Sequence, residues 1–190
     1  MLVEPLAPGL LLAAPTMVDT YFEHAVIFLL EANAAGAMGF IVSRPLELTL
    51  GEVGLAMDLN VHPSYTQDHV YGGGPVTPEL GWIVARRNEH TPADLEVAME
   101  FDGDIVVLTA IDSLRRLLET PEQEFRLVLG YSGWGADQLE SELRDGSWVP
   151  HTFDPAPLFG DVPEEQLWRE LMNEQGLGER LLWGKPVSEC

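Results

Sequence analysis

Residues 125–140 read Phe-Arg-Leu-Val-Leu-Gly-Tyr-Ser-Gly-Trp-Gly-Ala-Asp-Gln-Leu-Glu, and the residue pattern changes twice along them. The apolar run 125–129 is typical of a strand, and the glycines of 130–135 are typical of a turn. From Ala136 the apolar residues recur at helical spacing until Gly146, a favoured helix stop. The stretch therefore predicts a strand, a glycine-rich turn and a helix.

Ser132 sits in this predicted turn, which is the setting of a nucleophile elbow. That elbow needs a glycine two residues before and two residues after the serine. Gly130 meets the first requirement, but Trp134 occupies the second position, and no spacing specifies His151 as the base. We therefore favour a structural turn, or a ligand site made of main-chain amides and the Trp134 ring, over serine hydrolysis.

Upstream, the sequence predicts two strands, a hairpin and a short helix. An apolar run over 9–14 is the first strand, and the uninterrupted apolar run 25–30 predicts a strand buried on both faces. Turn residues at 33–36 make residues 25–42 a hairpin of adjacent antiparallel strands. Thr49 followed by Glu52 forms a capping box, which predicts a helix over about 50–58.

The remaining elements follow from similar patterns. Residues 60–79 are rich in Pro, Gly, His and Asp and predict a loop. The expected elements are strands over 80–85, 95–99 and 105–109, a helix over 114–119 capped by Ser113, an extended segment at 148–149, and a helix that begins at Pro163, buries Leu167, Trp168, Leu171 and Met172 and ends at Gly176. We expect one α+β domain over 1–190, built on a mixed, mostly antiparallel sheet, with 176–190 as a flexible tail.

The run Gly72-Gly73-Gly74-Pro75 lies in the predicted loop and has two interpretations. It is not a phosphate loop, because the only lysine of the chain is Lys185. Nor is it a dinucleotide fingerprint, because Thr77 stands where the third glycine belongs. We expect these glycines to turn through positive φ or to pass close to another segment, with close approach of a ligand as the alternative.

The charge of the chain excludes several partners. Ten basic residues against 31 acidic ones give a formal charge of -21, which repels nucleic acids and anionic lipid. The basic pairs Arg86-Arg87 and Arg115-Arg116 lie among acidic residues, so we expect them to form intramolecular ion pairs. Direct nucleic-acid binding is not expected.

The same sequence predicts a cytoplasmic protein without a membrane segment. Acidic residues or prolines interrupt every apolar run before it is long enough to span a bilayer. The first positive side chain is Arg44, so the N-terminus lacks the charged region of a signal peptide. Cys190 is the single cysteine, and an intrachain disulfide is excluded.

The five histidines do not have the spacing of a metal site. They are His24, His62, His69, His90 and His151. A site made by His62, Asp68 and His69 is conceivable, but scattered loop histidines are usually solvated, so no metal or cofactor is predicted.

Four segments occur in an order that resembles the YqgE/AlgH family. They are Leu11-Leu12-Ala13-Ala14-Pro15 with Asp19 and Phe22, Gly36-Ala37-Met38-Gly39-Phe40-Ile41-Val42 with Arg44-Pro45, Gly73-Gly74-Pro75-Val76, and Gly130-Tyr131-Ser132-Gly133-Trp134-Gly135-Ala136-Asp137-Gln138-Leu139-Glu140. The resemblance covers about residues 8–175. It implies a bacterial cytosolic protein in which a mixed, partly barrel-like sheet is surrounded by helices. It also brings a link to transcriptional control, for which this sequence offers no direct contact with DNA.

We predict a non-enzymatic binding or regulatory protein that acts on transcription, if at all, indirectly. Its partner is an unknown small molecule or protein, and the oligomeric state is left open. The candidate ligand-binding residues are Gly72, Gly73, Gly74, Pro75, Tyr131, Ser132, Gly133, Trp134 and Gln138. The prediction requires the two glycine-rich segments to meet at one accessible hollow. The alternative is an enzyme of hydrolase type that uses the turn over 130–135, with Ser132 or His24 taking part.

Overall fold

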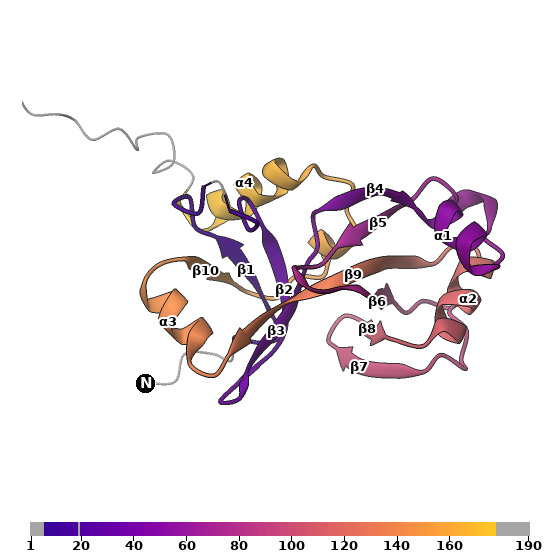
Figure 1. The fold of residues 1–190 in the computed structure, drawn as a ribbon, viewed down its shortest axis with the longest axis horizontal. Coiled ribbons are helices and arrows are strands. Elements are labelled where there is room, and N and C mark those ends of the chain that lie inside the picture. The colour runs from indigo at the N-terminus through magenta and orange to yellow at the C-terminus, as the bar shows by residue number, and fades with distance from the viewer. Residues whose placement is uncertain (1–5, 19, 178–190) are drawn as a thin grey trace, which may run out of the picture.

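The computed structural model of the chain describes residues 6–18 and 20–177 (Figure 1). The strands are β1 (Gly9–Ala13), β2 (Val26–Asn33), β3 (Gly36–Ile41), β4 (Pro45–Thr49), β5 (His69–Gly72), β6 (Val76–Arg86), β7 (Val97–Phe101), β8 (Ile105–Leu108), β9 (Glu124–Gly135) and β10 (Trp148–His151). The helices are α1 (Leu50–Met57), α2 (Ile111–Glu119), α3 (Gln138–Arg144) and α4 (Glu164–Glu174), with short 3-10 turns η1 (Pro63–Tyr65) and η2 (Ala156–Leu158).

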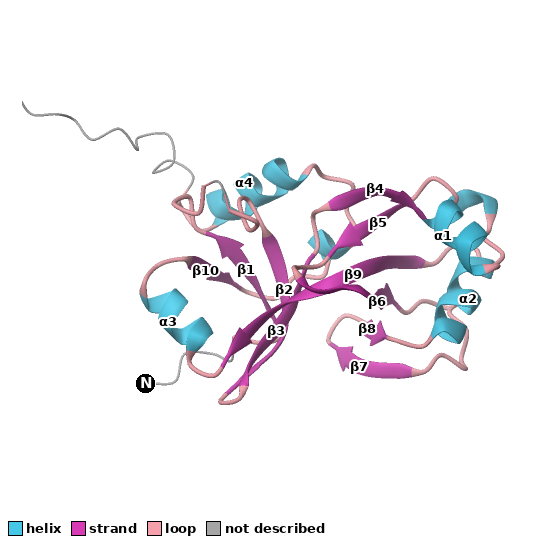
Figure 2. Cartoon of the chain, in the orientation of Figure 1, coloured by secondary structure: helices cyan, strands magenta, loops and turns pink. Residues whose placement is uncertain are grey.

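Within the described ranges the strands form one sheet, in the order β10-β1-β2-β3-β9-β6-β8-β7, with β5 branching from β9 and β4 pairing with β5. The pairs are antiparallel except for β5 and β9, which run parallel. The sheet curls, and the helices lie around it: α3 at one end, α1 and α2 at the other, and α4 across one side (Figure 2). This is the α+β fold with a mixed, mostly antiparallel, partly barrel-like sheet that the sequence predicts.

Strand β9 joins the two parts of the sheet. Its first half pairs with β5 and β6, and its second half pairs with β3, with Gly36 opposite Gly135 and Gly39 opposite Ser132. Gly130, at the change of partner, has a φ of +69°. Glycine adopts this conformation without the steric cost that a side chain would add, so the strand bends here and continues.

The predicted turn over 130–135 is therefore wrong, because these residues are the second half of β9. The pattern of burial shows why: Ser132 and Trp134 are buried, while Gly133 between them and Gly135 after them are exposed. That alternation is the period of a strand. The predicted loop over 60–79 is also too long, since it contains β5 and the start of β6.

Three apolar clusters fill the space around the sheet. Residues of β1 and β2 alternate between two of them: Leu10 and Phe28 face the central cluster under α4, while Leu11 and Ile27 face the cluster under α3. This explains why the two strands lack polar alternation and confirms that β2 is buried on both faces. The predicted hairpin of β2 and β3 is also confirmed.

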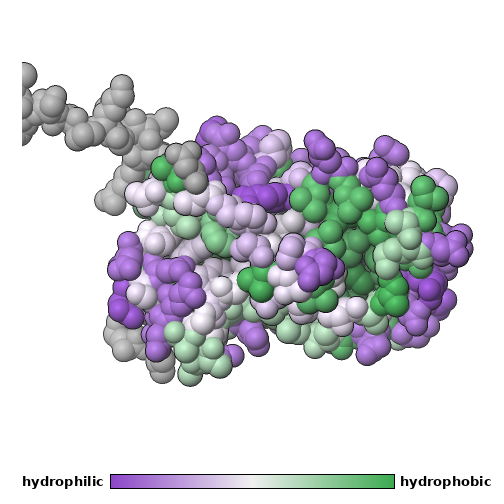
Figure 3. Space-filling view, in the orientation of Figure 1, coloured by the Kyte–Doolittle hydropathy of each residue, from purple (hydrophilic) through white to green (hydrophobic). Residues whose placement is uncertain are grey.

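The third cluster lies under α1 and α2, which cover their end of the sheet only in part. Leu46, Leu48 and Leu129 remain partly exposed around it. Figure 3 shows hydrophobic surface at this end of the molecule. Leu55, on α1, is 87% exposed and contributes nothing to the core.

The helices begin and end largely where the sequence predicts. The four apolar residues of α4 are all buried, and Gly176 follows the helix with a positive φ. Helix α2 differs, because it begins at Ile111 with Ala110 as N-cap. The predicted cap, Ser113, lies inside the helix, and its hydroxyl accepts a hydrogen bond from the Glu96 amide.

No helix in the described ranges combines the length and the apolar character needed to cross a bilayer. The predicted flexible tail lies, from residue 178 on, outside the described residues.

The capping box of α1 is present as predicted. The Thr49 hydroxyl accepts a hydrogen bond from the Glu52 amide at 3.2 Å, and the Glu52 carboxylate accepts one from the Thr49 amide at 2.8 Å. We expect Thr49→Ala to lower the free energy of unfolding by about 1 kcal/mol, since one helix amide loses its partner. Urea unfolding measures the change. Thr49→Ser keeps the acceptor and should stay near wild type; an equal loss in both variants would contradict the cap.

Candidate functional site

The two predicted glycine-rich segments meet in the structure. The Gly73 amide donates to the Leu129 carbonyl at 2.8 Å, and the Gly73 carbonyl accepts from the Ile41 amide at 2.9 Å. A Cβ atom at Gly73 would lie 2.5 Å from the Gly130 carbonyl oxygen, and one at Gly74 would lie 2.2 Å from the Tyr131 carbonyl oxygen. The glycines thus let two chain segments pass in contact, as the first of the two interpretations expects.

Much of this junction is sealed. Gly72, Gly73, Gly74 and Ser132 are buried, and the Ser132 hydroxyl donates to the Gly73 carbonyl at 3.0 Å. A fully buried hydroxyl that is already hydrogen-bonded is not presented to a substrate. The structure therefore gives Ser132 a packing role at this junction.

Other predicted residues line a shallow groove of about 460 Å³ on the outer side of the junction. It is lined by Tyr131, Gly133 and Trp134 of β9, by Val76 of β6, and by residues of the β2–β3 hairpin between Glu31 and Met38. Pro75 and Gln138 are exposed but do not line the groove. A ligand site of main-chain amides needs free N–H groups at the end of this segment. The Gly135 amide is not free, because it donates a hydrogen bond to the Gln138 side chain at 3.0 Å.

Trp134 is held in place by a carboxylate. Glu142 of α3 accepts hydrogen bonds from the indoles of Trp134 and Trp148, each at 2.8 Å, and from the Gln138 amide group at 2.9 Å. Partial burial acts to raise the pKa of Glu142, but the hydrogen bonds from Trp148, Gln138 and Trp134 outweigh it and leave the pKa below its ordinary value. Glu142 therefore remains ionised and fixes both rings.

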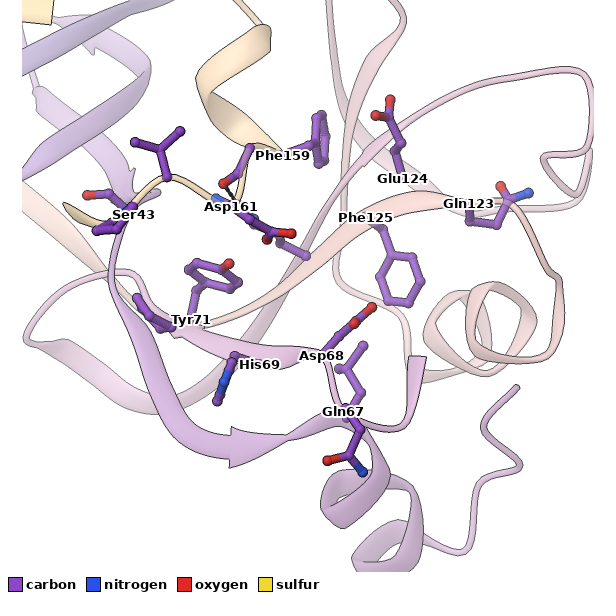
Figure 4. A pocket seen from close by; sticks show the side chains of 16 residues that line it. Ser43, Gln67, Asp68, His69, Tyr71, Gln123, Glu124, Phe125, Phe159 and Asp161 are labelled. Atoms are coloured by element: carbon purple, nitrogen blue, oxygen red, sulfur yellow. Dashed lines mark hydrogen bonds between the residues drawn. The ribbon is translucent and has the colours of Figure 1, made fainter. Parts of the chain in front are cut away.

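A larger cavity, of about 650 Å³, lies where no site was predicted (Figure 4). It opens between the β4–β5 region, the first half of β9 and the connection from η2 to α4. Its lining residues are Ser43, Pro45, Leu50, Gln67, Asp68, His69, Tyr71, Gln123, Glu124, Phe125, Arg126, Phe159, Gly160, Asp161, Val162 and Pro163. The mixture of apolar walls and a few converging polar groups is typical of a small-molecule site.

Arg126 of β9 is the buried charge of this cavity, with 7% of its surface exposed. Its guanidinium lies 4.0 Å from the centre of the Tyr71 ring and donates to the carbonyl oxygens of Val42 and Gly160. Within the described residues it forms no ion pair with a carboxylate. Burial lowers the pKa of Arg126 and raises that of Tyr71, because each charged form loses water. Interactions of Arg126 with Tyr71 and with the charge of Asp161 partly offset the effect of burial on the pKa of Arg126.

Two exposed carboxylates stand at the rim, Asp68 before β5 and Asp161 in the η2–α4 connection. Figure 4 shows them approaching the cavity from different sides. Partial desolvation, together with the charge of Asp161, raises the pKa of Asp68. Among the described residues, neither side chain has a hydrogen-bond or ion-pair partner.

Ser43 completes the wall beside Arg126. Its hydroxyl is buried and, within the part of the chain that the structure describes, has no hydrogen-bond partner. His69 is occupied, since its Nδ1 lies 2.7 Å from the Leu46 carbonyl oxygen.

The histidines do not converge elsewhere. Among the described residues, no three side chains of His, Cys, Asp and Glu are grouped so as to hold a metal ion. His62 Nδ1 contacts the Ser64 hydroxyl at 2.7 Å. His24 packs on the Trp168 ring, with 4.6 Å between ring centres, and His151 lies 3.2 Å from Glu174.

The arginine pairs are engaged within the molecule, as the sequence predicts. Arg86 contacts Glu124 at 2.7 Å and Arg87 contacts Glu100 at 2.8 Å. Arg115 contacts Asp112, and Arg116 contacts Asp94 at 3.1 Å.

The fold and sequence are similar to a known group of bacterial proteins. The AlgH-like family profile matches residues 10–179. A UPF0301 protein of Vibrio cholerae is 37% identical over 175 residues, covering 88% of this chain and 90% of the relative. A UPF0301 protein of Myxococcus xanthus is 33% identical over 180 residues, covering 95% and 96%.

Two solved structures extend the comparison. The solution structure of the AlgH protein from Pseudomonas aeruginosa has a TM-score of 0.71 and 32% identity, covering 100% of this chain and 98% of that one. A crystal structure of a Corynebacterium diphtheriae protein has a TM-score of 0.68 at 19% identity, covering 99% and 91%, and shows the same fold.

Proposed function

This chain belongs to the AlgH-like family, and we propose that it is a non-enzymatic binding protein of the bacterial cytoplasm. Its ligand occupies the cavity over Arg126. The observation that carries the proposal is the burial of Arg126 without an ion pair in the described part of the chain. Arg126 is a buried guanidinium without a carboxylate partner among the described residues, at the wall of a cavity large enough for a small molecule.

A buried charge is costly unless it is paired. Two backbone carbonyls, the Tyr71 ring and the more distant charge of Asp161 stabilise Arg126, but among the described residues no carboxylate forms an ion pair with it. A ligand with an anionic group would supply a direct ion pair. Binding energy of this kind is available without any reactive side chain.

The position of Ser132, the candidate nucleophile, favours binding over catalysis. Ser132 is fully buried and hydrogen-bonded to Gly73. A hydrolase that used the second half of β9 would first have to open that junction. A link to transcription would act through the bound ligand or a partner protein, because a net charge of -21 opposes contact with DNA.

The groove beside Tyr131, Gly133 and Trp134 stays a second candidate site, because it gathers three of the predicted residues at an accessible surface. Its walls present no buried charge, so it offers less selective binding. Tyr131→Ala alters this groove and leaves the lining of the larger cavity intact.

The test is retention of small molecules from bacterial extract by the purified protein. We expect Arg126→Gln to weaken retention about tenfold or more, because hydrogen bonds to a charged group contribute about 1.5–3 kcal/mol. The matched control is Arg87→Gln, directly after the neighbouring strand β6, because neither Arg87 nor its ion-pair partner Glu100 lines the cavity. Mass spectrometry identifies the retained molecules, and circular dichroism confirms that each variant is folded.

Should Arg126→Gln fail to fold, Arg126→Lys keeps the charge but not the planar fork, and it replaces the first variant. Equal retention by wild type and the Arg126 variants would overturn the proposal. Loss of retention only in Tyr131→Ala would move the site to the groove.

A further inference from the structure

We infer that the cavity over Arg126 selects a zwitterion, with its anionic group at Arg126 and an ammonium group between Asp68 and Asp161. The inference rests on the proposed function and adds the class of ligand. It follows from three properties of the lining, which are taken in turn.

Arg126 retains capacity for an anion. A guanidinium has five N–H donors in a fixed plane, and the hydrogen bonds to Val42 and Gly160 use two of them. Among the described residues no further acceptor is hydrogen-bonded to it. A carboxylate matches the fork geometry of guanidinium donors.

The rim requires a cation. Asp68 and Asp161 are two carboxylates of the same cavity, and neither has a hydrogen-bond or ion-pair partner among the described residues. The charge of Asp161 acts on Asp68, so the two carboxylates repel each other, and an ammonium group between them would relieve this repulsion. Its three N–H donors can be shared between the two side chains.

The cavity disfavours a ligand that carries only a negative charge or only a positive charge. Asp68, Asp161 and Glu124 make the lining acidic, so they repel a simple anion on its way to Arg126. Arg126 in turn repels a simple cation. A metal ion is a poor fit, because the described residues contain no group of three ligands here.

The walls suit an apolar body between the two charged ends. Tyr71, Phe125 and Phe159 line the same space, and its volume of about 650 Å³ exceeds that of a single small ion. Methylene groups or an aromatic ring of the ligand would pack on these rings. The chemistry is that of an amino acid or a related molecule with separated amine and carboxylate.

The test uses a series of ω-amino acids, namely glycine, 4-aminobutyrate and 6-aminohexanoate. Hexanoate and hexylammonium, which each lack one charge, are the matched controls. Chemical-shift titration of the labelled full chain measures the affinities. We expect at least one amino acid to bind about tenfold or more tightly than both controls, as for loss of one charged hydrogen bond.

Asp161→Asn tests the ammonium end of the ligand separately from the carboxylate end. It should weaken the amino acid about tenfold and leave hexanoate binding equal or stronger, because it removes the cation partner and one repulsive charge. Asp102→Asn, in an exposed turn outside the cavity lining, is the matched control and should change neither.

The outcomes distinguish the two proposals. Equal affinity for hexanoate and 6-aminohexanoate would overturn the zwitterion and leave the proposed cavity in place. Binding of no member of the series, while extract molecules are still retained through Arg126, would also overturn the zwitterion alone. Arg126-independent retention would remove both.

Discussion

Gly74→Ala is expected to leave little folded protein at ordinary temperature. Gly74 has a φ of +155°, and a Cβ atom there would lie 2.2 Å from the carbonyl carbon and oxygen of Tyr131. Those atoms belong to the backbone of β9, so they cannot turn aside as a side chain would. The strand that joins both parts of the sheet would have to move.

The expected cost exceeds about 4 kcal/mol, which is a large part of the stability of a domain of this size. Soluble yield and the urea midpoint measure it. Gly81→Ala is the matched control on β6, because its Cβ would meet Leu127 at 3.6 Å, an ordinary contact. We expect that variant to stay within about 1 kcal/mol of wild type. Similar stability of the two variants would show that the junction of Gly74 and Tyr131 yields easily.

The glycine run shows what sequence can establish at such a junction. Three consecutive glycines predict a backbone that something approaches closely, and this is what the structure contains. The sequence does not identify the approaching segment, because β5 and β9 are far apart in the chain. Local patterns gave correct predictions where the interacting residues are close in sequence, as in the capping box of α1 and the β2–β3 hairpin.

The second half of β9 was missed for a related reason. Gly130, Gly133 and Gly135 each suggest a turn when they are considered alone. What makes them a strand is pairing with β3, which supplies the hydrogen bonds of the ladder from a distant part of the sequence. The available signal in the sequence was the alternation of Ser132 and Trp134 with Gly133 and Gly135.

The sequence pattern of β9 also did not predict the cavity over Arg126. The run 125–129 was interpreted as apolar, although Arg126 stands in its middle. A charged residue inside an apolar strand was therefore the signal available for this site. Its surroundings could not be predicted, because Asp68, Tyr71 and Asp161 reach it from segments that only the folded sheet brings together.

Glu142→Ala is expected to lower the free energy of unfolding by about 2–5 kcal/mol at neutral pH, because two indole N–H groups lose a charged acceptor. Both rings are almost completely buried, with Trp134 at 7% and Trp148 at 3% exposure, so water replaces the carboxylate poorly. Tryptophan fluorescence during urea unfolding follows the change. Glu140→Gln on the same helix is exposed and should alter stability by less than about 0.5 kcal/mol.

The pH dependence of the same interaction gives a second, independent measurement. Because the folded-state pKa of Glu142 lies below its ordinary value of 4.5, its contribution is fully present above that value and is lost as pH falls through the lowered pKa. Glu142→Gln, which cannot ionise, should therefore be less stable than wild type at neutral pH, and the difference should narrow in acid. A difference that stays constant across this range would mean that the rings are fixed by packing alone. If the difference narrows, the charge of Glu142 contributes to holding Trp134 at the groove and Trp148 at the end of the sheet, because both rings donate hydrogen bonds to it.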